Sequence, residues 1–364
     1  MLKIIFVHLL NDYSGSPKVL SQVIKTVREE YEVELFTGKS EDGFLSGLNV
    51  DHHFYFYRRF ENKYLTLITF MLSQVHLFFK LLKFKNEDVT IYVNTLLPFG
   101  AGLAGKYMQK EVYYHIHETS IQPAIFKKFL RFMVQKTASK VFFVSESLAK
   151  LEAFEEIPQE VIYNAISDDF ISEANTFEYN PQREDVFNVL MICSLKAYKG
   201  IHEFIEIAHL CSINTDITFT LLLNADQNEI DLYFKEIDLV KNITIVSRQK
   251  DVLPFYKNAS LVMNLSRVDQ WVETFGLTIV EALSFGIPVI VPPVGGPVEI
   301  VREGLDGYLI SSYETASISE LILELATDKE QCLMLSKNAK ERATYFSEDV
   351  FEKNILHIFN TTSS

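Results

Sequence analysis

Residues 272–291 read VETFGLTIVEALSFGIPVIV, and this stretch indicates the fold of the chain. A helix pattern runs from Gly276 to Leu283, Gly286 is placed to end it, and Pro288 opens a short apolar run. Glu273 stands in the loop ahead of the helix, and Glu281 lies within it. A helix that feeds a short apolar run is typical of a parallel sheet covered on both faces.

The same alternation extends over all 364 residues, a length that suits two domains. Apolar runs typical of strands fall at residues 3–7, 32–36, 89–93, 112–115, 140–144, 161–163, 188–193, 218–223, 243–246, 260–264, 288–291 and 307–309. We therefore predict an α/β protein with domains at 1–167 and 186–346. The intervening segment 168–185 is rich in Asp, Glu, Asn and Pro and is the candidate hinge. A last helical segment, 347–364, carries an apolar face at positions 350, 351, 355, 358 and 359.

The composition is that of a folded protein, with 48% apolar and 23% charged residues. Three scattered cysteines without a CxxC pattern predict buried free thiols in a reducing compartment. The apolar start of the chain is interrupted by His8 and lacks a small-residue cleavage site, so we expect a first strand and a cytoplasmic protein. Residues 1–165 hold 19 basic against 18 acidic side chains, and the remainder holds 15 against 30. Because no whole domain is basic, a nucleic-acid partner is not expected.

The most apolar stretch, 64–84, approaches the length of a membrane span. Ser73, Gln74, His76 and Lys80 sit within it and favour a buried or interfacial helix over a spanning one. Basic residues flank this stretch and a second apolar segment: Arg58, Arg59, Lys63, Lys80, Lys83, Lys85, Lys127, Lys128, Arg131, Lys136 and Lys140. Two interpretations stay open, peripheral contact with an anionic membrane or solvated lysines on core helices.

The segment around Glu273 suits a nucleotide diphosphate. The N–H groups at the start of a helix bind anions, and here they belong to Phe275, Gly276, Leu277 and Thr278. The eight-residue spacing of Glu273 and Glu281 is by itself weak evidence for such a site, since Glu152 and Glu160 are also eight residues apart. A helix cap followed by one exposed glutamate is the competing interpretation.

The flanks of this segment carry a family resemblance. In order along the chain come DVLPFYKNA (251–259), the Glu273/Glu281 segment, GIPVI (286–290), Gly295-Gly296 with EIV (299–301), and GLDGYL (304–309). Together they closely resemble the C-terminal half of the retaining glycosyltransferase family 4, the "glycosyl transferases group 1", which has the GT-B fold. The resemblance implies two Rossmann-like domains whose parallel sheets face each other across a cleft, with the last helix crossing back to the first domain.

Weaker matches extend the resemblance over nearly the whole chain. Lys199, in YKG (198–200), looks like the family's phosphate-binding lysine, and His117, in HIHE (115–118), like its histidine near the reacting sugar. Gly15, in DYSGS (12–16), looks like the glycine of the first βα loop, and with Asn94 it falls on the acceptor side. Taken one at a time, His117 could be a hydrogen-bonded structural histidine, Lys199 a surface lysine and Gly15 a turn glycine. Gly295-Gly296 could be a tight strand-to-helix turn.

One departure concerns the phosphate site. The family pattern places an arginine five residues before the lysine, where this chain has Ser194, and Lys196 could compensate as a point charge. Asn224 replaces a family glycine after the next strand, where we expect it to adopt the left-handed backbone of the turn. Arg248 is placed to line the base pocket.

The resemblance implies transfer of a sugar from a nucleotide-diphosphate donor to an acceptor hydroxyl, with retention of configuration and without a metal or other cofactor. Glu273 would orient the sugar and Glu281 would hold the ribose. The acceptor would be a glycan or a lipid-linked glycan, in surface polysaccharide or glycolipid synthesis at the inner face of a membrane. An inverting enzyme of the same fold, a phosphorylase-like enzyme and a non-catalytic nucleotide-sugar-binding protein are the alternatives.

Overall fold

The computed structural model describes residues 2–39 and 42–360, so Met1 and the last four residues of the predicted terminal segment lie outside it. The chain divides into two units. The first comprises residues 1–164 and 351–364, and the second comprises residues 165–350.

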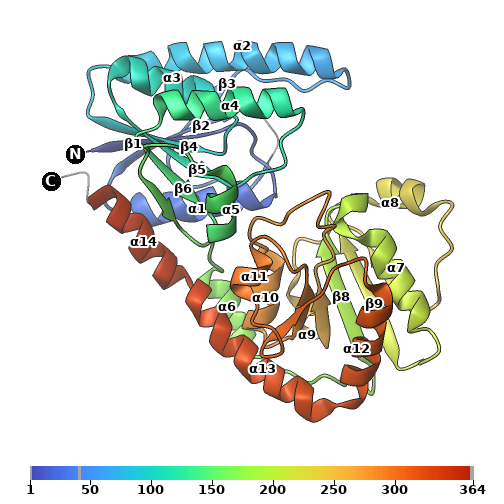
Figure 1. Cartoon of the computed structure of the whole chain (residues 1–364). Helices are drawn as coiled ribbons and strands as arrows, with labels where there is room; N and C mark the ends of the chain where they lie inside the picture. The colour runs from blue at the N-terminus through green and yellow to red at the C-terminus, as the bar shows by residue number, and fades with distance from the viewer. Residues whose placement is uncertain (1, 40–41, 361–364) are drawn as a thin grey trace. The chain divides into compact units, whose positions relative to one another are not determined.

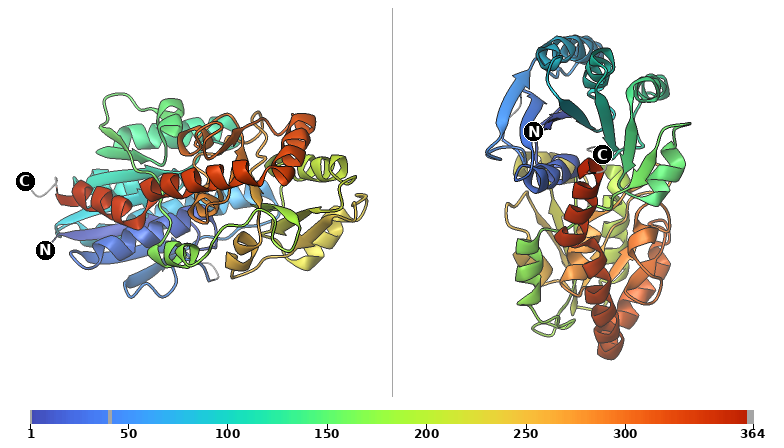
Figure 2. Two further views of the ribbon diagram at one scale, coloured as in Figure 1. Left: turned by 90° about the horizontal axis from the view of Figure 1, so that it is seen from below. Right: turned by 90° about the vertical axis from the view of Figure 1, so that its left-hand side faces the viewer.

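In the described part of the first unit, seven parallel strands form one sheet in the order β3-β2-β1-β4-β5-β6-β7 (Figure 1). The strands are β1 (Lys3–His8), β2 (Glu32–Gly38), β3 (Asp51–Tyr55), β4 (Val89–Asn94), β5 (Glu111–Ile116), β6 (Lys140–Phe143) and β7 (Gln159–Val161). The helices are α1 (Gly15–Val27), α2 (Lys63–Leu81), α3 (Phe99–Met108), α4 (Ala124–Thr137), α5 (Glu146–Glu152) and the last helix of the chain, α14 (Glu348–Asn360). Helices α2, α3 and α4 cover one face of the sheet, and α1 and α14 cover the other (Figures 1 and 2).

Every residue of the second unit is described, and six parallel strands form its sheet in the order β10-β9-β8-β11-β12-β13. The strands are β8 (Phe187–Cys193), β9 (Ile217–Leu223), β10 (Ile243–Val246), β11 (Leu261–Met263), β12 (Val289–Val291) and β13 (Gly307–Leu309). The helices are α6 (Asp168–Asn175), α7 (Ile201–Leu210), α8 (Gln227–Phe234), α9 (Leu253–Lys257), α10 (Leu277–Ser284), α11 (Pro297–Ile300), α12 (Thr315–Thr327) and α13 (Lys329–Ala343). Helix α7 packs against α12, and α10 packs against α13 and α6.

Strand β3 was not expected, because its sequence DHHFY is too polar to be recognised as a strand. It pairs in parallel with β2 at the edge of the sheet. His52 Nε2 lies 2.8 Å from Thr37 Oγ1, and His53 Nε2 lies 2.9 Å from Glu34 Oε2. These cross-strand polar pairs replace the apolar alternation on which strand recognition depends.

The predicted hinge at 168–185 differs from the structure, which places the whole segment in the second unit. Three aromatic side chains hold it there. Phe170 and Phe177 pack against Phe285, with ring centroids 5.5 and 5.8 Å apart, and Tyr179 Oη donates to the Ser260 carbonyl oxygen at 2.7 Å. The segment's polar composition concealed these contacts.

The last helix, α14, packs onto the first unit as the resemblance implied. Phe351, Ile355, Ile358 and Phe359 are buried, whereas Val350, expected on the same face, is exposed. The ring of Phe359 lies 6.1 Å from that of Tyr92, a residue of the central strand β4.

Each sheet changes its direction of strand addition once. The change falls between β1 and β4 in the first unit and between β8 and β11 in the second. In open parallel sheets, ligands bind beyond the carboxyl ends of the strands at such a switch point. The two switch points are therefore where candidate site residues should gather.

Candidate functional site

Lys199 and Glu273 meet at the switch point of the second unit. Lys199 ends the turn after β8, and Glu273 lies in the loop after β11. The Lys199 Nζ lies 2.7 Å from Glu273 Oε2, and both side chains are largely buried. The Ser266 hydroxyl donates to the same carboxylate oxygen at 3.2 Å.

This ion pair sets the protonation of the site. Burial opposes ionisation of Glu273, but the Lys199 charge and the hydrogen bonds from Lys199, Ser266 and Asn264 outweigh it and hold the Glu273 pKa below its ordinary value. Burial raises the pKa of the Cys193 thiol, at the end of β8, to about 12. The nearby Lys199 charge lowers this pKa and the Glu273 charge raises it. At neutral pH Glu273 is therefore a carboxylate and the Cys193 thiol is uncharged.

An aromatic side chain that the sequence analysis did not select covers this pair. Trp271 stacks on Tyr198 with ring centroids 4.9 Å apart, and the Lys199 Nζ lies 5.0 Å from the centroid of the indole ring. Arg267 joins the same turn, since its backbone N–H donates to the Tyr198 carbonyl oxygen at 2.8 Å and its guanidinium pairs with Glu203 at 2.7 Å. Trp271 is the only tryptophan of the chain and lies eight residues beyond β11, and this was the signal available in the sequence.

Three glycines let the loops of this site approach closely. A Cβ on Gly200, which has φ +82°, would lie 2.2 Å from the Leu265 carbonyl oxygen. A Cβ on Gly295, with φ +78°, would lie 2.3 Å from the Glu273 carbonyl oxygen, to which the Gly296 N–H donates at 2.8 Å. Gly295 and Gly296 thus make more than a strand-to-helix turn, because they hold the backbone of Glu273 in place.

Helix α10 begins beside this pair, as predicted. Gly276 has φ +110° and precedes the first helical residue, Leu277. Ile279 and Val280 donate to the Gly276 carbonyl oxygen, so the N–H groups of Leu277 and Thr278 lie in the first turn, where no intrahelical acceptor exists. Phe275 is buried, and its ring lies 5.7 Å from that of Phe346. The start of α10 is thus anchored behind the ion pair.

Glu281, just over one turn into α10, is buried. Its Oε2 accepts a hydrogen bond from the Tyr256 hydroxyl at 2.7 Å. Burial and the Glu281 charge raise the Tyr256 pKa, so the phenol stays a donor. The interpretation of a simple exposed glutamate therefore does not describe Glu281.

The remaining donor-side residues lie around the same strand ends. Ser194 is half-buried directly after β8, its carbonyl oxygen accepts from the Lys196 N–H at 2.7 Å, and the Lys196 side chain is exposed. Arg248, exposed after β10, donates through Nε to Asn224 Oδ1 at 2.6 Å. Asn224 does not have the expected left-handed backbone. Its N–H donates to the Cys193 carbonyl oxygen, so Asn224 continues the pairing of β9 with β8.

The first unit gathers its candidates at its own switch point. Asn94, the last residue of β4, accepts a hydrogen bond through Oδ1 from His117 Nε2 at 2.8 Å, and its amide Nδ2 lies 3.2 Å from His8 Nδ1 and from the Ser16 carbonyl oxygen. Ser16 follows Gly15, the exposed first residue of α1. His117, Asn94 and the start of α1 therefore form one connected cluster, to which His8 is the member that sequence reasoning missed.

Burial keeps the histidines of this cluster uncharged. It lowers the pKa of His8 to about 4 and that of His115 to about 3, and it lowers the pKa of His117 with help from both neighbours. Burial raises the pKa of Glu118 to about 7, against hydrogen bonds from the N–H groups of Leu96 and His117. The cluster can thus exchange hydrogen bonds with a polar ligand but carries little positive charge.

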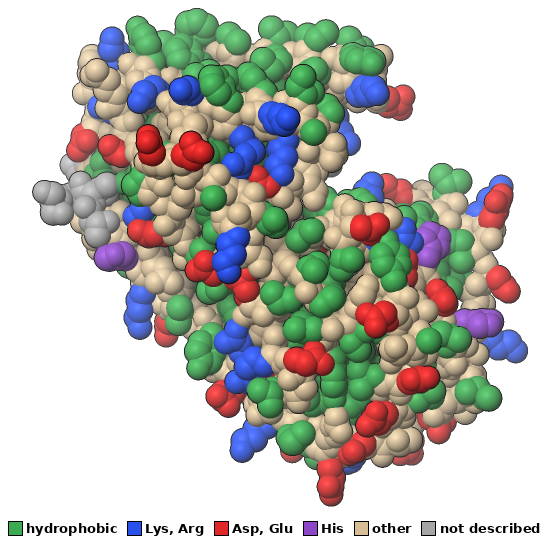
Figure 3. Space-filling view, in the orientation of Figure 1, with side chains coloured by type: hydrophobic (Ala, Val, Ile, Leu, Met, Phe, Trp, Pro, Cys, Tyr) green, Lys and Arg blue, Asp and Glu red, His purple; other side chains and the backbone are tan. Residues whose placement is uncertain are grey.

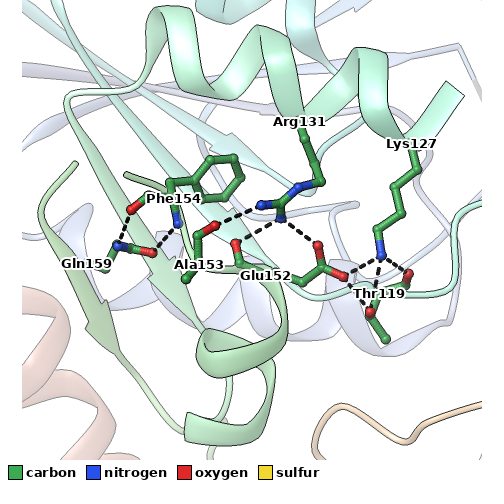
Figure 4. A network of polar contacts seen from close by, with 7 residues as sticks. All are labelled: Thr119, Lys127, Arg131, Glu152, Ala153, Phe154 and Gln159. Atoms are coloured by element: carbon green, nitrogen blue, oxygen red, sulfur yellow. Dashed lines mark hydrogen bonds and ion pairs between the residues drawn. The ribbon is translucent and has the colours of Figure 1, made fainter. Parts of the chain in front are cut away.

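A buried ion cluster fixes the loop that follows His117 and Glu118 (Figure 4). The Glu152 carboxylate accepts from the Thr119 hydroxyl and from Lys127, and Arg131 Nη1 lies 2.6 Å from Glu152 Oε2. Glu160, eight residues on, pairs with Lys140 at 2.6 Å. Glu152 and Glu160, which are spaced like Glu273 and Glu281, are therefore structural residues.

Within residues 2–39 and 42–360, no group of three or more His, Cys, Asp or Glu side chains is placed to hold a metal ion.

Comparison with known proteins identifies the second unit. Residues 172–342 match the model of the family "Glycosyl transferases group 1". The second unit belongs to that family. N-acetyl-alpha-D-glucosaminyl L-malate synthase of Bacillus anthracis is 29% identical over 171 residues, which are 45% of this chain and 41% of that protein. Sucrose-phosphate synthase of Spinacia oleracea is 31% identical over 109 residues, 30% of this chain and only 10% of that much longer protein.

Solved structures extend the comparison to the whole chain. HepE of Anabaena, in complex with UDP and glucose, superimposes with a TM-score of 0.80 at 20% identity, covering 98% of this chain and 99% of that one. Sucrose-phosphate synthase of Thermosynechococcus elongatus gives a TM-score of 0.77 at 17% identity, covering 100% and 99%. These likenesses show that the chain has the GT-B fold.

Proposed function

We propose that the chain is a glycosyltransferase that moves a sugar from a nucleotide-diphosphate donor to an acceptor hydroxyl with retention of configuration. The observation that carries the proposal is the buried pair of Lys199 and Glu273 beside the start of α10, at the switch point of a group 1 transferase unit. A cation and a helix start suit a diphosphate, and a carboxylate suits sugar hydroxyls.

The donor is held by the second unit. Lys199 and Lys196 neutralise the diphosphate together with the first-turn amides of α10, so the proposed reaction needs no divalent ion. Glu281, oriented by Tyr256, binds the ribose hydroxyls, and Glu273 binds the sugar. Arg248, held by Asn224, lines the pocket for the nucleotide base.

The acceptor side belongs to the first unit. Asn94 and His117 offer hydrogen bonds to an acceptor, next to Gly15. Because burial keeps His117 uncharged, it serves as a hydrogen-bond partner rather than as a cation.

In the reaction, the bond between the anomeric carbon and the diphosphate oxygen breaks. The acceptor oxygen bonds to the anomeric carbon from the same face, and its proton passes to the leaving diphosphate. Glu273 stabilises positive charge that develops on the sugar. The proposed acceptor is a glycan or lipid-linked glycan of surface polysaccharide or glycolipid synthesis, at the cytoplasmic face of a membrane.

A panel of UDP, GDP, ADP, CDP and dTDP in a thermal-shift assay tests the donor site. A true donor nucleotide at 100 times its dissociation constant adds about 2.7 kcal/mol to the free energy of unfolding. Turnover of the matching labelled nucleotide sugar separates an enzyme from a binding protein. NMR of the product's anomeric proton separates retention from inversion.

A further inference from the structure

Helix α2 is apolar on both sides, yet only one side packs against the protein. Its buried residues include Phe70, Leu77 and Leu81, which face the rest of the first unit. The opposite side is exposed and is formed by Tyr64, Leu65, Ile68, Leu72, Val75 and Phe79. From Leu65 to Phe79 these residues recur at intervals of three and four, so they form one stripe along the helix, with Tyr64 at its start. Figure 3 shows apolar side chains gathered over α2 at the outer edge of the first unit.

The polar residues in the middle of α2 explain why it is not expected to span a membrane. By length and composition, α2 and the turn after it, Lys63–Phe84, pass as a candidate span among the described residues. Gln74, however, is buried and accepts through Oε1 from the Gly100 N–H at 3.1 Å, and Ser73 is buried beside it. A Cβ on Gly100 would lie 2.3 Å from the Gln74 carbonyl oxygen, so α2 and α3 are in close backbone contact. Helix α2 is thus built into the layer that covers the sheet.

The charge of that layer points to the partner. The fully described helices α2, α3 and α4 contain no Asp or Glu, in a chain whose net charge is −14. They carry seven cations, Lys63, Lys80, Lys106, Lys127, Lys128, Arg131 and Lys136. Lys127 and Arg131 pair with Glu152, which offsets their charge. The others leave the layer basic around an apolar stripe.

Aromatic rings stand beside two of these cations and beside Lys85, which follows the turn after α2. Lys63 Nζ lies 5.4 Å from the ring centroid of Tyr64, and Lys136 Nζ lies 5.6 Å from that of Phe132. Lys85, just after α2, lies 5.5 Å from the ring of Tyr107 in α3. Aromatic and cationic side chains side by side are typical of the headgroup level of a bilayer, where ring and charge are both satisfied.

We infer that the outer face of α2 docks on an anionic membrane, with the helix lying flat in the interface. The stripe Tyr64, Leu65, Ile68, Leu72, Val75 and Phe79 enters the acyl boundary, and the surrounding lysines meet anionic headgroups. A second copy of this chain fits less well, because two such basic layers would face each other with like charge. A 19-residue helix offers a contact line of about 28 Å.

Co-sedimentation with vesicles tests this docking. The full chain is expected to bind phosphatidylglycerol-containing vesicles at least about tenfold more tightly than pure phosphatidylcholine vesicles, and the difference should shrink in high salt. The double variant Ile68→Glu/Leu72→Glu changes two side chains that are each 55% exposed, so the core is untouched. It is expected to lose at least tenfold in binding.

The matched control is Ile213→Glu/Leu232→Glu, two strongly exposed apolar residues of the second unit. It should bind vesicles like the wild type. An insertion readout comes from Val75→Trp combined with Trp271→Phe, whose emission should shift to the blue with anionic vesicles. Absence of vesicle binding by the wild type, equal losses in both double variants, or a dimer that only the α2 variant dissociates would overturn the inference.

Discussion

Replacing Glu273 by Gln should change nucleotide binding and turnover in opposite directions. The Lys199 and Glu273 charges are 2.7 Å apart and largely buried. At an effective dielectric constant of about 20, their attraction is about 6 kcal/mol, most of which the desolvation of both groups offsets. A diphosphate must compete with the Glu273 carboxylate for Lys199. We expect removal of that carboxylate to be worth about 1 kcal/mol, or roughly fivefold, in nucleoside diphosphate affinity.

Turnover should fall at the same time, because the sugar loses its carboxylate. We expect a loss of at least about tenfold, equivalent to about 1.4 kcal/mol of transition-state stabilisation. The assays are calorimetric titration with the nucleoside diphosphate that the thermal-shift panel selects and release of that nucleotide from its sugar donor. The amide keeps the shape of Glu273 and can still accept from Ser266.

The matched control is Glu160→Gln, which removes an ion pair of similar length, 2.6 Å to Lys140, outside both switch points. It should alter neither quantity. Unchanged turnover in Glu273→Gln, or equal losses of nucleotide affinity and turnover, would refute the assigned role of Glu273.

Four further outcomes are expected. Gly295→Ala places a Cβ against the Glu273 carbonyl oxygen, so it should lower the free energy of unfolding in urea by about 1–3 kcal/mol and lower turnover. Unchanged stability and turnover would show that the two loops do not need this contact. Tyr256→Phe removes the hydroxyl that donates to the buried Glu281 at 2.7 Å and should weaken nucleotide affinity several-fold in calorimetry. Equal affinity of the variant and the wild type would show that Glu281 does not bind the ribose. Burial lowers the pKa of His115 from 6.5 to about 3, so the stabilisation that the neutral buried imidazole gives the fold is present above pH 6.5 and is lost as pH falls toward 3. In the His115→Asn variant the free energy of unfolding should therefore fall less steeply with decreasing pH over that window, by up to about 1.4 kcal/mol per pH unit. Phe359→Ala should lower the free energy of unfolding by about 3–5 kcal/mol, and a loss below 1 kcal/mol would contradict the packing of α14.

The sequence predicted the parts of the fold that depend on apolar periodicity. Runs such as 188–193 and 218–223 correspond to β8 and β9 because buried parallel strands are almost uninterruptedly apolar. β3 escaped because its edge position is stabilised by polar pairs between His52, His53 and their neighbours on β2. The packing of segment 168–185 onto the second unit could not be predicted, because it depends on a few aromatic side chains, such as Phe170, in an otherwise polar stretch.

The candidate site was predictable where a local pattern exists and not where loops meet. Glu273 stands before a recognisable helix start, so its position could be read directly from the chain. The contacts of Trp271 with Tyr198 and of Gly295 with Glu273 join loops far apart in sequence, and no local pattern encodes them. The burial of His8 beside Asn94 likewise depends on strand order, since β1 and β4 are neighbours only in the folded sheet.

Calorimetric titration of the wild type and of Lys199→Met with the five nucleoside diphosphates tests the central claim most directly. The structure predicts that at least one of them binds the wild type and that Lys199→Met weakens it at least about tenfold, because the phosphate loses its buried cation. Lys199→Met combined with Glu273→Gln removes the unpaired buried carboxylate and should restore stability but not affinity. No binding by any of the five, or equal binding by the wild type and Lys199→Met, would contradict the account.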